Sequence, residues 1–220
     1  MRILLLKNLR EKDNNKLKTI ELFGLSRSGK TTLLKDLIKK GNKGLLTDYI
    51  SLQKKIFLSL RYFLIHPLKT VYLFYKLNTN WIVLPFLKPK DYFLIWKMRN
   101  SYLSSVLAKY QIVKNSKDKI YLDEFLIQSI FMIIQRKSNK KEIMDILDRL
   151  PPSGEILIIG SNKIERYNRI KNTRFPAQQI NKDYSIEWMK NSEYNYKIIK
   201  KILIKKYGPI DKIWKKKITL

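Results

Sequence analysis

The run from Gly24 to Thr31 constrains this chain more than any other part of its 220 residues. It reads Gly-Leu-Ser-Arg-Ser-Gly-Lys-Thr and matches the phosphate-binding pattern G-x-x-x-x-G-K-[ST] without a gap. A short apolar stretch, 18–23, precedes it, and apolar residues at helical spacing follow it as far as Gly41. This order predicts a strand, a glycine-rich turn and a helix.

Each part of this loop suits a different part of a nucleotide. Gly24 and Gly29 let backbone N–H groups surround phosphate oxygens at the amino end of the helix. Lys30 brings a positive charge to the β- and γ-phosphates, and the hydroxyl of Thr31 is a ligand for Mg²⁺. We therefore predict ATP and Mg²⁺ as cofactors. The predicted cofactor-binding residues are Gly24, Ser26, Arg27, Ser28, Gly29, Lys30, Thr31 and Thr32.

Carboxylates follow two of the predicted strands. Residues 119–124 form an apolar run that ends in Asp123 and Glu124, a pattern that resembles a Walker B element. In that pattern Asp123 binds Mg²⁺ together with Thr31, and Glu124 orients a nucleophile or receives its proton. Residues 45–49 predict another strand with Asp48 near its carboxyl end, where ligands of open α/β sheets bind. Asp48 or Glu124 is thus predicted to orient an acceptor.

The remaining pattern predicts an α/β fold. The apolar run 155–160 is the strongest strand candidate, and 125–136, 140–150 and 185–207 have the spacing of helices. Alternating apolar runs and helices are typical of a parallel sheet covered on both faces. We expect one domain over 1–220 with the three-layer fold of P-loop NTPases, a mostly parallel central sheet and a helical insertion after the second strand. Residues 3–6 and 209–214 predict short strands, the first of them at an edge.

The helical insertion, 52–115, is aromatic and basic. Its first helix, 52–65, is apolar around most of its circumference, so it must be buried or face an apolar partner. Residues 90–109 predict a second helix. The insertion is either a packed helical layer on the acceptor side or a surface that docks on an anionic membrane.

Arginines gather after the strand at 155–160, although lysine prevails elsewhere. Arg166 and Arg169 are three residues apart and would share one face of a helix. One planar guanidinium group can bind two phosphate oxygens at once. These arginines therefore favour a phosphate contact over a solvated basic face.

Charge and cysteine content indicate which partners and which cellular compartment to expect for this protein. The formal charge is +28 with a pI of about 10.1, which favours phosphates, nucleic acid or an anionic membrane as partners. The lysines are spread widely, as in a composition bias, so nucleic acid is less favoured than a small-molecule acceptor. The absence of cysteine excludes disulfides and thiolate metal sites. We expect a cytoplasmic protein without a secretion signal or membrane span, or one that is peripheral on the inner membrane face.

The order of these parts resembles that of P-loop kinases for nucleosides and nucleoside monophosphates. Residues 24–32 are similar to the thymidylate kinase loop, with Ser26 in place of Asp and Ser28 in place of Thr. The resemblance implies a phosphotransferase and a lid over 161–176, with its arginines and the loop arginine on the transferring phosphates. It thereby completes the predicted catalytic set: Lys30, Arg27, Asp123, Glu124, Asp48, Arg166 and Arg169.

The resemblance leaves the acceptor open. The family commonly has Asp-Arg-Tyr after the middle strand, whereas this chain has Asp-Glu-Phe at 123–125. A nucleotide, a sugar or a glycan precursor all fit the residues. Two other functions also remain: a P-loop ATPase or switch that acts on a membrane, nucleic acid or protein, and a sulfotransferase-like enzyme. The carboxylate pair favours a magnesium nucleotide over a sulfonate donor, and the oligomeric state stays open.

Overall fold

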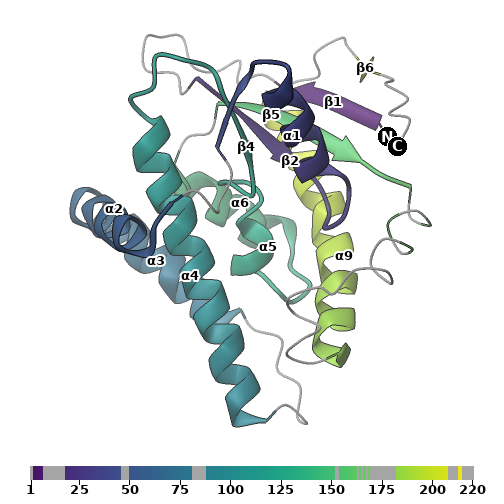
Figure 1. Ribbon diagram of the computed structural model, residues 1–220. Helices are drawn as coiled ribbons and strands as arrows, with labels where there is room; N and C mark the ends of the chain where they lie inside the picture. The colour runs from purple at the N-terminus through teal and green to yellow at the C-terminus, as the bar shows by residue number, and fades with distance from the viewer. Residues whose placement is uncertain are drawn as a thin grey trace.

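The computed structural model describes residues 2–6, 18–45, 50–80, 88–151, 154–162, 164, 166, 168, 182–207 and 213–214. The strands are β1 Arg2–Leu6, β2 Thr19–Phe23, β3 Lys43–Leu45, β4 Ile120–Asp123, β5 Glu155–Gly160 and β6 Ile213–Trp214. The helices are α1 Lys30–Lys39, α2 Leu52–Ile65, α3 Pro67–Thr79, α4 Pro89–Val113, α5 Ile130–Ile133, α6 Lys140–Arg149 and α9 Lys182–Tyr207 (Figure 1).

The six strands form one sheet in the order β3-β4-β2-β5-β1-β6. Neighbouring strands from β3 to β5 are parallel, whereas β1 runs antiparallel to both β5 and β6. The expected α/β class and mostly parallel sheet are confirmed. The interpretation of 3–6 as an edge strand was wrong, because β1 pairs on both sides. The chain leaves β2 toward β4 and β3 and later crosses to β5, so β2 lies where the strand order reverses, the usual ligand position in such sheets.

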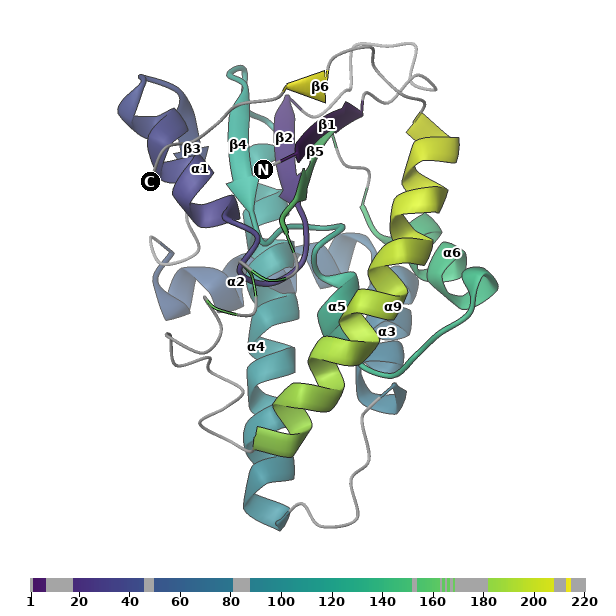
Figure 2. The ribbon, with the colours of Figure 1, turned by 90° about the vertical axis from the view of Figure 1, so that its right-hand side faces the viewer.

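Helices lie on both faces of the sheet, as Figure 2 shows for α1 and α9. On one face, Leu34 of α1 packs with Leu22 of β2. On the other, Phe23 of β2 packs in the cluster that contains Leu107 of α4 and Ile199 of α9, and its ring stacks on Phe131 at 5.6 Å. Both faces of β2 are therefore covered, in keeping with the expected three layers.

Two predicted elements differ from those in the structure. The strand expected at 45–49 is β3, at Lys43–Leu45. It begins two residues earlier than expected, and Gly44 lets α1 lie directly on it: a Cβ there would be 2.7 Å from the side chain of Ile38. Residues 46–49, and with them Asp48, lie outside the described residues. The helix expected over 125–136 is a turn followed by the four residues of α5, because the N–H of Gln128 donates to a buried carboxylate of β2.

The insertion after β3 is helical, as expected, and α2 lies beside α4 (Figure 1). However, α2 is exposed along most of its length, and Tyr62 is its buried residue. Within the described residues, no helix combines the length and the apolarity that crossing a bilayer requires.

Candidate nucleotide-binding site

The loop between β2 and α1 has the conformation of an anion cradle. Arg27 and Gly29 have φ angles of 62° and 94°, and the N–H of Ser28 donates to Leu25 O at 3.2 Å. Backbone of this kind turns N–H groups into a concavity that suits phosphate. Gly29 precedes α1, and no side chain of the described residues caps that end of the helix. The amino end of α1, with its partial positive charge, therefore faces the loop.

Gly24 is required by the close approach of the loop to β5. A Cβ at this position would lie 2.6 Å from the carbonyl oxygen of Ile159 and 2.9 Å from Ser28 Oγ. The first contact is with backbone, which cannot rotate away. The glycine at the start of the pattern thus sets the path of the loop.

The loop and β4 meet in one hydrogen bond. The register of β2 and β4 pairs Leu22 with Asp123, which places this carboxylate next to the start of the loop. Thr31 Oγ1 donates to Asp123 Oδ2 at 3.0 Å across 92 positions of sequence. Asp123 is 4% exposed, and its buried Oδ1 has no hydrogen-bond donor among the described residues. A hydroxyl and a carboxylate with a spare oxygen suit a hard cation such as Mg²⁺.

Lys30 lies beneath the loop. Its Nζ donates to Gly24 O and Leu25 O, both at 2.9 Å, and the side chain is buried. Burial lowers the pKa of Lys30 to about 8, against the carboxylates of Glu124 and Asp123, which raise it. The group is thus largely charged at neutral pH. Its nearest acceptors are two neutral carbonyls, so a phosphate would be a stronger partner for the cation.

Glu124 and Arg166 border the same region. Glu124 has a φ of 48° and an exposed side chain, while that of its neighbour Asp123 points inward. Arg166 is buried and forms an ion pair with Glu193 of α9. Its charge contributes to the lowered pKa of Lys30. The arginine therefore lies within electrostatic range of the loop, although it faces α9.

The structure thus brings together the loop, Asp123 and Glu124, with Arg166 nearby. Ser26 and Arg27 are half-buried within the loop, and Ser28 is buried. Thr32 is exposed on the first turn of α1. Asp48 and Arg169 lie outside the described residues, as does most of the expected lid.

Sequence reasoning missed three polar residues that hold the turn after β4: Lys109 and Glu21 are buried, and Gln128 is half-buried. Lys109 of α4 is fully buried, and its Nζ donates to the carbonyl oxygens of Asp123 (3.0 Å) and Glu124 (3.2 Å). Glu21 accepts from the N–H of Gln128, whose side chain in turn accepts from the N–H of Gly24 at 3.2 Å. These contacts tie the turn to the start of the loop.

The sequence does contain a signal for two of these residues. Lys109 lies three positions after Val106 and four before Val113, so it shares the buried face of α4. Glu21 is a lone carboxylate inside an apolar strand whose five residues are all buried. In a chain with 46 lysines and arginines, however, one more lysine carries little information by itself.

The sequence matches no protein family and no curated protein, and the structure matches no solved structure. Function is therefore inferred from the site itself.

Substitution at Gly24 tests the shape of the loop. Gly24→Ala is expected to destabilise the protein by about 1–3 kcal/mol, because the new Cβ overlaps the Ile159 carbonyl. It should also weaken nucleotide binding by about tenfold or more, which corresponds to roughly 1.4 kcal/mol. Gly41→Ala is the matched control: Gly41 has a φ of 82°, and a Cβ there would have no atom of the described residues within 4 Å. It should cost about 1 kcal/mol and leave affinity unchanged. Equal nucleotide affinity of both variants in calorimetry would contradict this account of Gly24.

Glu21 predicts a dependence of stability on pH. Burial raises the pKa of Glu21 from 4.5 to about 7, against the N–H groups of Ile127 and Gln128 and the Lys109 cation. Because the folded pKa is the higher one, the folded state binds more protons between these values, and stability falls as the pH rises through this window. The expected loss from Glu21 is about 3 kcal/mol.

Urea unfolding between pH 4.5 and pH 7.5 measures this loss. Glu21→Gln should remove most of the pH dependence, because the amide oxygen still accepts from Gln128 but carries no charge. Glu187→Gln, at a half-buried position on α9, is the control and should follow the wild type. A wild-type protein whose stability is flat across the window would show that Glu21 is not buried as described.

Proposed function

We propose that this protein is a P-loop phosphotransferase of the thymidylate kinase type, which transfers the γ-phosphoryl group of ATP to a small acceptor. The observation that carries the proposal is the hydrogen bond between Thr31 Oγ1 and Asp123 Oδ2. It joins the two sequence motifs of the predicted magnesium site at the carboxyl ends of adjacent parallel strands. A chance match to the loop pattern would not require this partner.

The residues of the chain then have distinct roles. The N–H groups around Gly29 and the ammonium of Lys30 would hold the phosphates, and Thr31 and Asp123 would hold Mg²⁺. When bound, Mg²⁺ supplies positive charge to the phosphate oxygens. Lys30 would exchange its carbonyl partners for phosphate oxygens, which makes its strongest interactions available only when a nucleotide is present.

Glu124 is proposed to orient the acceptor and to take its proton. Its carboxylate is exposed at the end of β4, whereas the spare oxygen of Asp123 is buried. Lys109 supports this division, because it fixes the carbonyl oxygens of both residues and hence the backbone that separates the two side chains. An accessible carboxylate within reach of a bound acceptor is what general-base catalysis needs.

The arginines would neutralise charge on the transferring group. Arg27 lies in the loop, and Arg166 would leave Glu193 to reach the phosphates. Such an exchange is a closing motion in which the lid excludes water. The roles of Arg169 and Asp48 remain sequence predictions.

Two assays separate this function from the other two. ATP that is radiolabelled in its γ-phosphate is incubated, with Mg²⁺ and the protein, with panels of nucleosides, nucleoside monophosphates and sugars. We expect labelled acceptor and stoichiometric ADP. Release of free phosphate that is stimulated by a macromolecule, with no labelled acceptor, would instead identify an ATPase or switch. In a separate titration, binding of the sulfonate donor 3'-phosphoadenosine 5'-phosphosulfate and not of ATP would identify a sulfotransferase-like enzyme.

A further inference from the structure

We propose that the outer face of the α2–α3 hairpin, residues 52–79, docks on an anionic bilayer. Large apolar side chains of both helices are exposed there, among them Phe57, Leu60 and Leu64 of α2 and Leu68, Val71 and Tyr75 of α3. Exposed fractions reach 76% for Leu64 and 84% for Leu68. Scattered apolar residues are normal on a surface, but a contiguous group marks an interaction site. We call this group the hairpin surface.

Most of the apolar side chains of α2 face away from the protein. Tyr62 is 1% exposed and packs edge-on against Tyr110 of α4 with ring centroids 5.6 Å apart. Leu60 and Leu64 are four residues apart, so they share another side of the helix, which is exposed. A surface helix normally directs its apolar stripe to the core. In α2 most of the apolar side chains are instead exposed, as expected of a helix that binds a partner through them.

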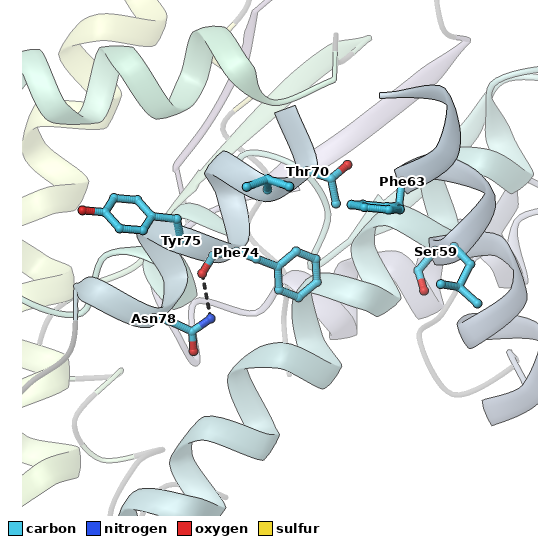
Figure 3. A pocket seen from close by; sticks show the side chains of 8 residues that line it. Ser59, Phe63, Thr70, Phe74, Tyr75 and Asn78 are labelled. Carbon is cyan, nitrogen blue, oxygen red and sulfur yellow. Dashed lines mark hydrogen bonds between the residues drawn. The ribbon is translucent and has the colours of Figure 1, made fainter. Parts of the chain in front are cut away.

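A hollow between the two helices continues this surface. It has a volume of about 550 Å³ and is lined mainly by apolar residues, including Leu60, Phe63, Val71 and Phe74. Figure 3 shows Phe63 and Phe74 pointing into the same space from the two helices. The hairpin thus offers apolar area both on its ridge and between its helices.

The charge of the hairpin indicates what kind of partner binds the hairpin surface. The sequence has no Asp or Glu from Tyr49 to Lys90, whereas it has seven lysines and arginines in that span. Lys54, Arg61 and Lys69 are exposed beside the apolar residues, and no carboxylate of the described residues pairs with them. A second copy of the chain would bring like charges together. Apolar side chains flanked by cations are the composition of helices that lie in an anionic membrane interface.

Vesicle flotation tests the inference without any nucleotide, so its outcome is independent of the proposed function. The wild type is mixed with phosphatidylcholine vesicles that contain about 30% phosphatidylglycerol, and with pure phosphatidylcholine vesicles. We expect the protein to float with the anionic vesicles at about 0.1 M salt. With the neutral vesicles it should stay in the bottom fraction, unbound.

Two variants separate the apolar and the electrostatic parts. Combined Phe57→Ser, Leu60→Ser and Leu64→Ser should lower the partition coefficient at least about tenfold, since each change removes apolar area. These side chains are exposed, so the variant should unfold at the wild-type temperature. Combined Lys54→Gln, Arg61→Gln and Lys69→Gln should weaken binding about tenfold or more. The matched control is Met144→Ser with Ile186→Ser, two exposed apolar residues outside the hairpin, which should bind as the wild type does.

Three outcomes would overturn the inference. Absence of binding to anionic vesicles would do so directly. Undiminished binding of the apolar variant would show that the +28 charge alone adsorbs the protein. The third outcome combines sedimentation velocity with flotation. If the wild type is a dimer, the apolar variant is a monomer and the wild type does not bind vesicles, the hairpin surface is an interface between two copies of the chain.

Discussion

Lys30→Met is expected to lower the rate of phosphoryl transfer by about a thousandfold or more while the protein stays folded. The charge is needed most when negative charge develops on the transferring group, so its loss acts mainly on kcat. Stability should change by about 1 kcal/mol or less, because the two lost hydrogen bonds to carbonyl oxygens are offset by relief of a buried charge. Steady-state kinetics and thermal unfolding measure the two effects. Lys35→Met, an exposed position on the same helix, is the control.

The same residue sets a pH dependence of nucleotide affinity. Burial lowers the pKa of Lys30 to about 8 in the free protein. Phosphate anions favour the ammonium form, so binding raises this pKa and takes up a proton when the pH is near or above 8. Affinity should fall about tenfold from pH 7 to pH 9, as the charged fraction falls. The Lys30→Met variant should lack this dependence. If the Lys30→Met variant keeps its phosphoryl-transfer activity, the loop takes no part in the reaction.

Asp123→Asn and Glu124→Gln are expected to have different effects although the residues are adjacent. Asp123 accepts from Thr31 and is buried, so Asp123→Asn should raise the Mg²⁺ concentration for half-maximal activity by about tenfold or more. Glu124 is exposed, so Glu124→Gln should spare nucleotide binding and slow transfer by about two to four powers of ten.

Kinetics at varied Mg²⁺ distinguish the two carboxylates. Asp118→Asn is the control, since Asp118 lies just before β4, at the opposite end of the strand, and pairs with Lys43 in solvent. If Asp123→Asn and Glu124→Gln have small and equal effects on the rate, the two carboxylates have no role in Mg²⁺ binding or in phosphoryl transfer.

The sequence was sufficient for the parts of the site that depend on local pattern. The motif specified glycine at Gly24 and Gly29, and the structure requires both: Gly24 lies against the Ile159 carbonyl oxygen, and Gly29 has a φ of 94°. Strands 155–160 and 120–123 are short apolar runs with polar ends, and their positions were predicted to within a residue or so. Thr31 and Asp123 were both predicted to bind Mg²⁺, and the structure joins them in a hydrogen bond at the carboxyl edge of the parallel strands.

What the sequence could not predict depends on contacts between distant segments. The turn after β4 replaces a helix because Glu21, more than a hundred residues earlier, binds the Gln128 N–H. Lys109 is buried because two carbonyl oxygens accept its protons, and nothing in its neighbours along the chain specifies those acceptors. The outward orientation of α2 was also undetermined, since its apolar residues surround most of the helix and leave its buried side to packing against Tyr110.

Isothermal titration of the wild-type protein with ATP tests the central claim most directly. The loop, Lys30 and the bond from Thr31 to Asp123 predict one binding site per chain. Affinity should drop when Mg²⁺ is removed with EDTA, and it should weaken about tenfold or more in the Gly24→Ala variant but stay unchanged in Gly41→Ala. If neither ATP nor GTP binds in the presence of Mg²⁺, and neither raises the unfolding temperature, the assignment of a nucleotide site to this loop is wrong.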